Sequence, residues 1–408
     1  MPRLRLGRSY WLDTFQGAAP KLPPLRGTHR ADVAIVGGGV TGCAAALLFA
    51  RAGATVALAE SARIGRGSTA ASTALLMQEP DADFVDLLPK YGTAAAMRIW
   101  RRCRTAVTDM RRTLDALGTP ALRSLPSVYL TRDPDCVSTL RREAAARQRC
   151  HLAGRFVEGG SLHALIGFGA HGAIVTPGNA QVDPYRACLA LARAAASRGA
   201  SLFEGSAVTR IRGSRDGVEV TLERGRVLAD WAVIATGYAT PQFERLRARF
   251  RMMNTYAIAT PRLDAALRKR LRVADVMMWD TDRPYHYLRW TDDGRLLFGG
   301  RDRPRLAGAI RPAALKLRAM QLMSDLRSWY PALGAVHPEY AWEGLFAVTP
   351  DGLPYIGRHR LYPRQLFALG YGGNGMTLGF FAAQAVVRLA RGRPGPDDEL
   401  FGFARGRR

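Results

Sequence analysis

The chain has 408 residues, of which 48% are hydrophobic and 23% are charged; this composition excludes a disordered protein and allows two or three domains with a large core. The formal net charge of +25 raises nucleic-acid or membrane binding as candidate functions. However, the basic residues, nearly all arginine, are scattered and form neither a tail nor a stripe interleaved with aromatic residues. We therefore expect a solvated basic surface and no nucleic-acid partner.

The cysteines and histidines are widely spaced, and no CxxC pair occurs. The odd number of five cysteines indicates reduced thiols in a cytoplasmic protein, and we expect no metal site. Residues 33–50 form an uncharged run close to the length of a membrane span, but three consecutive glycines divide it. We read this run as a strand, a turn and a helix, and expect no integral membrane span.

Residues 1–27 are predicted to be an extended N-terminal arm. The first motif follows: a strand at 33–36, the glycine pattern Gly37-x-Gly39-x-x-Gly42, a helix to about residue 51 and a second strand at 55–59. This order is the βαβ fingerprint of dinucleotide-binding proteins.

Each position of the motif has a physical role in binding a dinucleotide. Gly37 permits the tight turn, Gly39 lets the backbone approach a pyrophosphate, and Gly42 lets the helix pack closely on the strand. The N-terminus of the helix carries a partial positive charge that faces the phosphates. Glu60, directly after the second strand, is predicted to accept hydrogen bonds from a ribose of the cofactor.

A second glycine loop follows at once in the segment SARIGRGSTAAS, with Ser61, Arg63, Gly67, Ser68 and Thr69 as candidate ligands. A nicotinamide cofactor does not need a second phosphate-facing loop at this position, whereas an enclosed FAD does. We therefore predict FAD as the dinucleotide.

Residues 199–237 alternate as strands do, turn twice and end in an apolar strand before Thr236 and Gly237. This resembles the hairpin and the ATG strand of FAD enzymes of the glutathione-reductase type. The resemblance implies that Val208 contacts the adenine through its backbone.

The segment LGYGGNGMTLG, residues 369–379, has five glycines and precedes an apolar helix. Together with VAIVGGGVTG, RIGRGST, VIATGY, RLLFGG and WEGLFAVTPDGLPYIG, it resembles the D-amino-acid oxidase (DAO) superfamily of flavoproteins, which includes glycine oxidases, sarcosine oxidases and γ-glutamylputrescine oxidoreductases. In that family the last glycine loop closes over the flavin, and the helix dipole stabilises negative charge on the reduced ring.

The resemblance implies an α/β fold of two domains: a discontinuous, Rossmann-like FAD domain of glutathione-reductase type and a mixed-sheet substrate domain. We expect the FAD domain at 28–85, 160–242 and 345–408, and the substrate domain at 86–159 and 243–344. The cofactor is expected to be bound non-covalently, since no cysteine or histidine occupies the attachment positions of the covalent relatives. The cofactor-binding candidates are Gly37, Gly39, Val40, Thr41, Gly42, Glu60, Ser61, Arg63, Gly67, Ser68, Thr69, Val208, Thr236, Gly237, Gly372, Gly373, Asn374, Gly375, Met376 and Thr377.

The substrate pocket is expected beside residues 284–289 (PYHYLR), a strand paired with RLLFGG through the turn at 291–294. Alternation along a strand would direct Tyr285, Tyr287 and Arg289 to one side and His286 to the other. Arg301 is a further pocket candidate, either paired with Asp302 or facing the substrate. The sequence identifies no catalytic acid or base.

The substrate prediction depends on a missing charge. Phe346 stands where glycine and D-amino-acid oxidases carry the arginine that holds the substrate carboxylate, and Thr377 stands where sarcosine oxidase carries a lysine. We therefore expect oxidation of a small-molecule amine or N-substituted amine, as in γ-glutamylputrescine oxidoreductase. The alternatives are an oxidase of D-amino acids, glycine or sarcosine, or a dehydrogenase that passes electrons to a quinone or a partner protein instead of O2.

Overall fold

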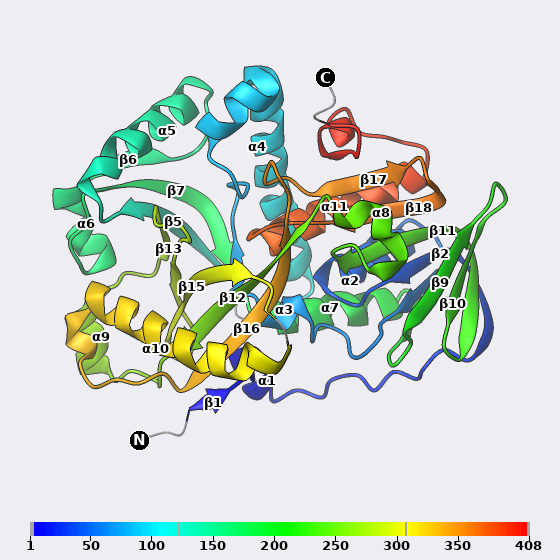
Figure 1. Ribbon diagram of the computed structural model, residues 1–408, viewed down its shortest axis with the longest axis horizontal. Helices are drawn as coiled ribbons and strands as arrows, with labels where there is room; N and C mark the ends of the chain where they lie inside the picture. The colour runs from blue at the N-terminus through cyan, green and yellow to red at the C-terminus, as the bar shows by residue number, and fades with distance from the viewer. Residues whose placement is uncertain (1–3, 121, 307, 406–408) are drawn as a thin grey trace.

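The computed structural model describes residues 4–120, 122–306 and 308–405 and contains two mixed β-sheets (Figure 1). The eight-stranded sheet has the order β17-β18-β11-β2-β3-β8, with β10 and β9 attached beside β11. Its strands are β2 (Gly27–Val36), β3 (Val56–Ala59), β8 (Ser201–Phe203), β9 (Val208–Gly213), β10 (Val218–Leu222), β11 (Gly225–Gly237), β17 (Tyr355–His359) and β18 (Tyr362–Leu369).

The first motif forms the centre of this sheet. β2 pairs in parallel with β3 on one side and with β11 on the other, so Val33 lies between Val56 and Trp231. Helix α2 (Val40–Arg51) joins β2 to β3 and packs between α7 (Pro184–Ala196) and α11 (Gly375–Ala390), on the right in Figure 1. Because it is enclosed by these neighbours, α2 is apolar around nearly its whole circumference.

The ten-stranded sheet has the order β1-β16-β12-β15-β14-β13-β5-β7-β4, and β6 pairs with β7. Most of its pairs are antiparallel. Its strands are β1 (Arg5–Leu6), β4 (Leu75–Leu76), β5 (Arg123–Thr131), β6 (Arg155–Glu158), β7 (Gly172–Gln181), β12 (Arg251–Ala259), β13 (Met277–Asp280), β14 (Tyr287–Trp290), β15 (Leu296–Pro304) and β16 (Tyr340–Val348).

Helices cover both sheets. Helix α10 (Arg311–Trp329) packs on β12, β15 and β16, and the long α4 (Phe84–Ala116) packs against α11, between the two halves of the molecule (Figure 1). The remaining α-helices are α1 (Tyr10–Asp13), α3 (Ser68–Ala71), α5 (Val137–Arg149), α6 (Gly159–Ile166), α8 (Glu244–Arg247) and α9 (Ala265–Leu271). Within the described residues, no helix is both long enough and apolar enough to cross a membrane.

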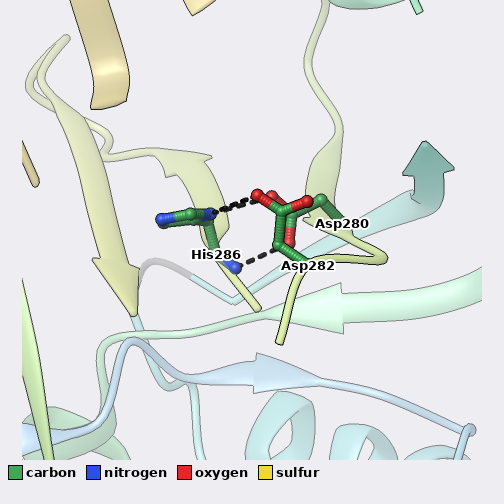
Figure 2. A group of neighbouring side chains, drawn as sticks. All are labelled: Asp280, Asp282 and His286. Atoms are coloured by element: carbon green, nitrogen blue, oxygen red, sulfur yellow. Dashed lines mark hydrogen bonds and ion pairs between the residues drawn. The ribbon is translucent and has the colours of Figure 1, made fainter. Parts of the chain in front are cut away.

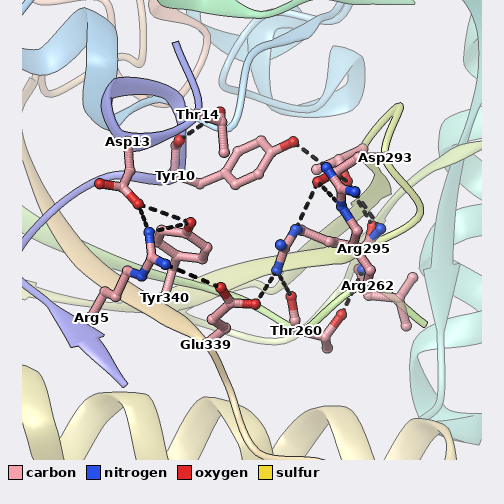
Figure 3. A network of polar contacts seen from close by, with 12 residues as sticks. Arg5, Tyr10, Asp13, Thr14, Thr260, Arg262, Asp293, Arg295, Glu339 and Tyr340 are labelled. Carbon is pink, nitrogen blue, oxygen red and sulfur yellow. Dashed lines mark hydrogen bonds and ion pairs between the residues drawn. The ribbon is translucent and has the colours of Figure 1, made fainter. Parts of the chain in front are cut away.

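The N-terminal residues lie along the ten-stranded sheet. β1 pairs in parallel with β16, and Arg5 donates a 3.0 Å hydrogen bond to the hydroxyl of Tyr340. The hydroxyl of Tyr10 donates a 2.7 Å hydrogen bond to Asp293, which lies in the turn between β14 and β15 (Figure 3). These hydrogen bonds hold the N-terminal residues against the ten-stranded sheet.

The two sheets do not divide the chain at the expected domain limits. β7 lies in the expected FAD segment 160–242, yet it pairs with β5 in the ten-stranded sheet. β16 belongs to that sheet as well and extends past residue 345 to Val348. The domain limits predicted from the sequence therefore remain a proposal.

Candidate active site

A cavity of about 1130 Å³ lies where the parallel strands of the eight-stranded sheet end. Val36, Ala59 and Gly237, the last residues of β2, β3 and β11, line it together with residues of the ten-stranded sheet. The carboxyl edge of a parallel sheet is the usual ligand site in this architecture. The volume exceeds that of most small-molecule pockets, which suits a dinucleotide together with a substrate.

Most of the predicted cofactor residues line this cavity. They are Gly37, Gly39, Val40, Thr41, Glu60, Ser61, Gly67, Ser68, Thr69, Val208, Thr236, Gly237, Gly372, Gly373, Asn374, Gly375 and Met376. Gly42, Arg63 and Thr377 do not line it. The guanidinium of Arg63 pairs with Glu204 at 3.3 Å, and Thr377 is fully buried in α11.

The glycines of the first loop are required for different reasons. Gly37 has φ +108°, and a Cβ there would lie 2.7 Å from the carbonyl oxygen of Ala235. A Cβ on Gly42 would lie 1.9 Å from the carbonyl oxygen of Gly37, so only glycine lets α2 pack on the turn. A Cβ on Gly39 would meet only the Oγ1 of Thr69, at 3.2 Å. The fold therefore needs Gly37 and Gly42, while Gly39 leaves room on the cavity side.

The acidic residue after β3 and the start of β9 also border the cavity. The carboxylate of Glu60 accepts hydrogen bonds from the backbone N–H groups of Gly38, at 2.7 Å, and Ala62, at 2.9 Å. The carbonyl oxygen of Val208 accepts a 2.7 Å hydrogen bond from Gln242. Glu60 is thereby held at the mouth of the first glycine loop.

The C-terminal glycine loop leaves an acceptor without a partner. The side-chain amide of Asn374 donates to the carbonyl oxygens of Met77 and Glu79 at 2.8 and 2.7 Å. Its Oδ1 atom is buried and has no hydrogen-bond partner in the part of the chain that the structure describes. A Cβ on Gly67 would meet no atom within 4 Å, although this residue lines the cavity. An unsatisfied buried acceptor and open space beside a glycine fit a bound FAD.

Two tyrosines form a wall of the cavity beside the strand pair β14 and β15. This pair, predicted from the sequence, is confirmed, with Trp290 opposite Leu296. Tyr285 and Tyr287 both line the cavity, and the hydroxyl of Tyr287 lies 2.6 Å from the Oγ1 of Thr255. A Cβ on Gly299 would collide with the Tyr287 ring, so this glycine makes room for the tyrosine.

Two carboxylates, Asp81 and Asp302, share this wall. Asp81 accepts hydrogen bonds from the Tyr285 hydroxyl at 3.1 Å and from the backbone N–H of Gly373 at 2.8 Å, and burial raises its pKa. Burial raises the pKa of Asp302 to about 6, and the negative charge of Asp81 adds to the shift. Sequence reasoning missed Asp81 entirely, and the acidic segment EPDAD that contains it was the available signal.

The two arginine candidates do not line the cavity. Arg289 is 1% exposed, and its guanidinium donates to the carbonyl oxygens of Thr73, Ala74 and Val182 at 2.9 to 3.1 Å. Burial lowers its pKa to about 10. Arg301 has φ +59° and pairs with Asp325 rather than with its neighbour Asp302.

Behind the tyrosine wall, Asp280, Asp282 and His286 place three possible metal-ligand atoms within 4.8 Å of one another (Figure 2). The imidazole Nδ1 lies 2.8 Å from Asp280, and Nε2 lies 3.3 Å from Asp325. Burial alone lowers the pKa of His286, but its bonds to these two carboxylates outweigh burial and raise the pKa to about 9. Because both imidazole nitrogens face carboxylates, we describe this group as an ion cluster.

Comparison with known proteins agrees with this geometry. A family model described as DAO, FAD dependent oxidoreductase, matches residues 32–389. The γ-glutamylputrescine oxidoreductase of Escherichia coli (strain K12) is 26% identical in an alignment of 372 positions that covers 88% of this chain and 84% of that protein. The glycine oxidase of Bacillus licheniformis is 25% identical over 386 residues, 90% of this chain and 94% of that protein.

The crystal structure of glycine oxidase from Geobacillus kaustophilus has a similar fold, with a TM-score of 0.75 and 22% sequence identity over 90% of this chain and 96% of that one. The expected fold class and the expected FAD cofactor are thereby confirmed. The family model matches residues 32–389, and most of the predicted cofactor residues line one cavity. The chain therefore belongs to the DAO family of FAD-dependent oxidoreductases.

Proposed function

We propose that this enzyme oxidises the carbon–nitrogen bond of an amine or N-substituted amine, in the manner of a γ-glutamylputrescine oxidoreductase, by hydride transfer to FAD. The name of the Escherichia coli relative supports an amine as the donor. The observation that carries the proposal is the cavity wall: it presents Phe346, two tyrosines and two carboxylates where an amino-acid oxidase needs a cation for the substrate carboxylate.

The two arginines proposed from the sequence for the pocket are bound to other groups of the protein. Arg289 bonds to three backbone carbonyl oxygens, and Arg301 bonds to both carboxylate oxygens of Asp325. Removing either guanidinium from these partners would leave buried acceptors unsatisfied. A small α-amino acid would therefore find no free guanidinium from these two residues, and the loss of a charge-assisted bond costs about 1.5–3 kcal/mol.

The residues of the chain have separate roles in this function. Gly39, Thr69 and the N-terminus of α2 would hold the pyrophosphate of FAD, and Glu60 would hold its ribose. The glycines of the C-terminal loop would approach the flavin ring. Bound FAD supplies the acceptor for a hydride equivalent, while the protein positions the donor and excludes water. Tyr285 and Tyr287 close the substrate side of the cavity.

Anaerobic reduction of the flavin tests the proposal directly. Putrescine derivatives and N-alkylamines should bleach the bound FAD, and glycine, sarcosine and D-alanine should do so slowly or not at all. Rapid reduction by the amino acids, with none by the amines, would refute the proposal.

A charge placed at Phe346 gives a second test. Phe346→Arg should lower the KM for D-alanine about tenfold or more, because a guanidinium pairs strongly with a carboxylate. Phe346→Leu is the matched control: it removes the ring without adding charge and should leave D-alanine a poor substrate. A lower KM for D-alanine in both variants would show that ring size, not charge, sets the preference.

The electron acceptor is O2 or another oxidant. Sarcosine oxidase uses a lysine over the flavin to activate oxygen, but among the four lysines of this chain only the exposed Lys90 lines the cavity. This favours a slow oxidase or a dehydrogenase that passes electrons to a quinone or a partner protein. Admitting air to the amine-reduced enzyme decides between them, since an oxidase is reoxidised within seconds and releases hydrogen peroxide. From the cysteine pattern we propose the cytoplasm as its compartment.

A further inference from the structure

Asp81 is held in the cavity wall by groups from two distant segments. The backbone N–H of Gly373 and the hydroxyl of Tyr285 both donate to its carboxylate, at 2.8 and 3.1 Å. A Cβ on Gly372 would lie 2.2 Å from the same carboxylate, so the C-terminal glycine loop is shaped around this side chain. The carboxylate is therefore fixed in place before any substrate arrives.

Asp302 presents a second carboxylate to the cavity. Its Oδ1 atom is buried and has no hydrogen-bond partner among the residues the structure describes. Thr255, Asp81 and the charged His286 are the groups that act on its charge. A partly buried carboxylate with an unsatisfied oxygen is costly unless a donor binds it.

Among the described residues, Lys90, Arg147 and Arg283 are the cations that line this cavity. Lys90 is exposed, and the guanidinium of Arg147 pairs with Glu143 and Glu79. Arg283 borders the cavity, but its guanidinium donates to the carbonyl oxygens of Thr281 and Asp282. The positive charge of His286 is bound between Asp280 and Asp325. A ligand that brings N–H donors and a positive charge would satisfy Asp302 and offset the negative charge of both carboxylates.

We infer that Asp81 and Asp302 form the subsite that receives the positively charged nitrogen of the substrate. This inference rests on the proposed function and makes it more specific: the enzyme selects alkylammonium compounds and rejects carboxylates at this position. Asp302 is the specificity-determining residue that contacts the ammonium. Asp81, already bonded to Gly373 and Tyr285, positions the loop and adds negative charge.

The chemistry of the two carboxylates explains the selectivity. An ammonium group offers up to three N–H donors and one positive charge, so it can bond to Asp302 and be attracted by Asp81 at once. The α-carboxylate of an amino acid would add a third negative charge to the same wall. Like charges in a partly desolvated site repel strongly, and this repulsion discriminates against amino acids without a steric block.

The test uses the FAD-loaded enzyme and a cation that cannot be oxidised. In tert-butylammonium the carbon next to nitrogen bears no hydrogen, so it can bind without reducing the flavin. We expect a saturable change in the flavin absorption spectrum on titration with tert-butylammonium at about pH 8, and none with the isosteric anion pivalate. No saturable change with tert-butylammonium, or equal binding of the two compounds, would overturn the inference.

Substitutions at Asp302 test whether this residue is responsible for tert-butylammonium binding. Asp302→Asn should weaken tert-butylammonium binding about tenfold or more. It should raise the KM for an amine substrate more than it lowers kcat, and Asp302→Glu, which keeps the charge, should restore part of the affinity. Asp135→Asn, which removes an exposed carboxylate outside the cavity, is the control and should bind as the native enzyme does. The bound FAD content of each variant shows that it is folded.

The outcomes separate the inference from the proposed function. If tert-butylammonium binds and depends on Asp302 while no amine reduces the flavin, the subsite stands and the proposed function fails. If amines reduce the flavin but their KM is unchanged in Asp302→Asn, the function stands and the subsite is refuted.

Discussion

The ion cluster around His286 gives the most quantitative prediction. The imidazole is 7% exposed and stacks on Phe298 with an interplanar angle of 8°. Its Nδ1 atom faces Asp280 (Figure 2) and its Nε2 atom faces Asp325, and its pKa is raised from 6.5 to about 9. A histidine whose folded pKa is raised binds its proton more tightly in the folded state than in the unfolded state.

The sign and size of the effect follow from that shift. The stabilisation is fully present below the unfolded pKa of 6.5 and is lost as the pH rises through about 9. The rise of the His286 pKa from 6.5 to about 9 corresponds to about 3 kcal/mol of unfolding free energy. Because the side chain is buried, little of this is lost to screening by solvent.

The assay is denaturant unfolding of the FAD-loaded protein between about pH 6 and pH 9.5, for the native chain and for His286→Gln. The unfolding free energy of the native chain minus that of the variant should fall by about 3 kcal/mol across this range. The control His171→Gln removes an exposed imidazole outside this cluster and is unfolded over the same pH range. A difference between native and His286→Gln that is independent of pH would refute the reasoning, as would an NMR titration of His286 near its ordinary pKa.

Three further predictions concern the cofactor and the cavity. Gly39→Val should give a folded but colourless protein, because a Cβ there meets only the Oγ1 of Thr69 within the protein and the side chain would enter the proposed pyrophosphate site; a yellow, fully loaded variant contradicts this, as does loss of the native circular dichroism spectrum. Acid precipitation should release all of the FAD into the supernatant, and colour in the pellet would show a covalent link. Asp302→Asn should stabilise the apoprotein above about pH 6 by up to about 3 kcal/mol. The raised pKa of Asp302 means that its charged carboxylate is less favourable in the folded protein than in the unfolded chain, and asparagine removes that charge. That gain should vanish near pH 4, and denaturation curves at both pH values measure it; an equal gain at both would contradict the assignment.

The local features of the fold could be predicted from the sequence because they depend on near neighbours along the chain. Gly37 and Gly42 mark a turn that no other residue can form, and the structure gives both glycines the close contacts that require it. The strand pair β14 and β15 was visible from its turn, where Gly294 adopts φ +79°.

The tertiary structure alone decided which charges reach the cavity. Alternation along the strand grouped Arg289 with Tyr285 and Tyr287, but it carried no information about the carbonyl oxygens of Thr73, Ala74 and Val182 that bind this guanidinium, all more than 100 residues away in the sequence. A buried guanidinium must find acceptors for its N–H groups, and the packing of distant segments decides where those acceptors lie.

The place of Asp81 in the cavity wall could not be predicted for the same reason. Asp81 lies 292 residues before Gly373 and 204 residues before Tyr285, and only the folded chain brings the three together. Glycine patterns and strand periodicity thus determined the family, the cofactor and the place of the cavity. The polarity of the substrate wall was decided by long-range contacts, because the orientation and pKa of a side chain depend on the groups that surround it in space.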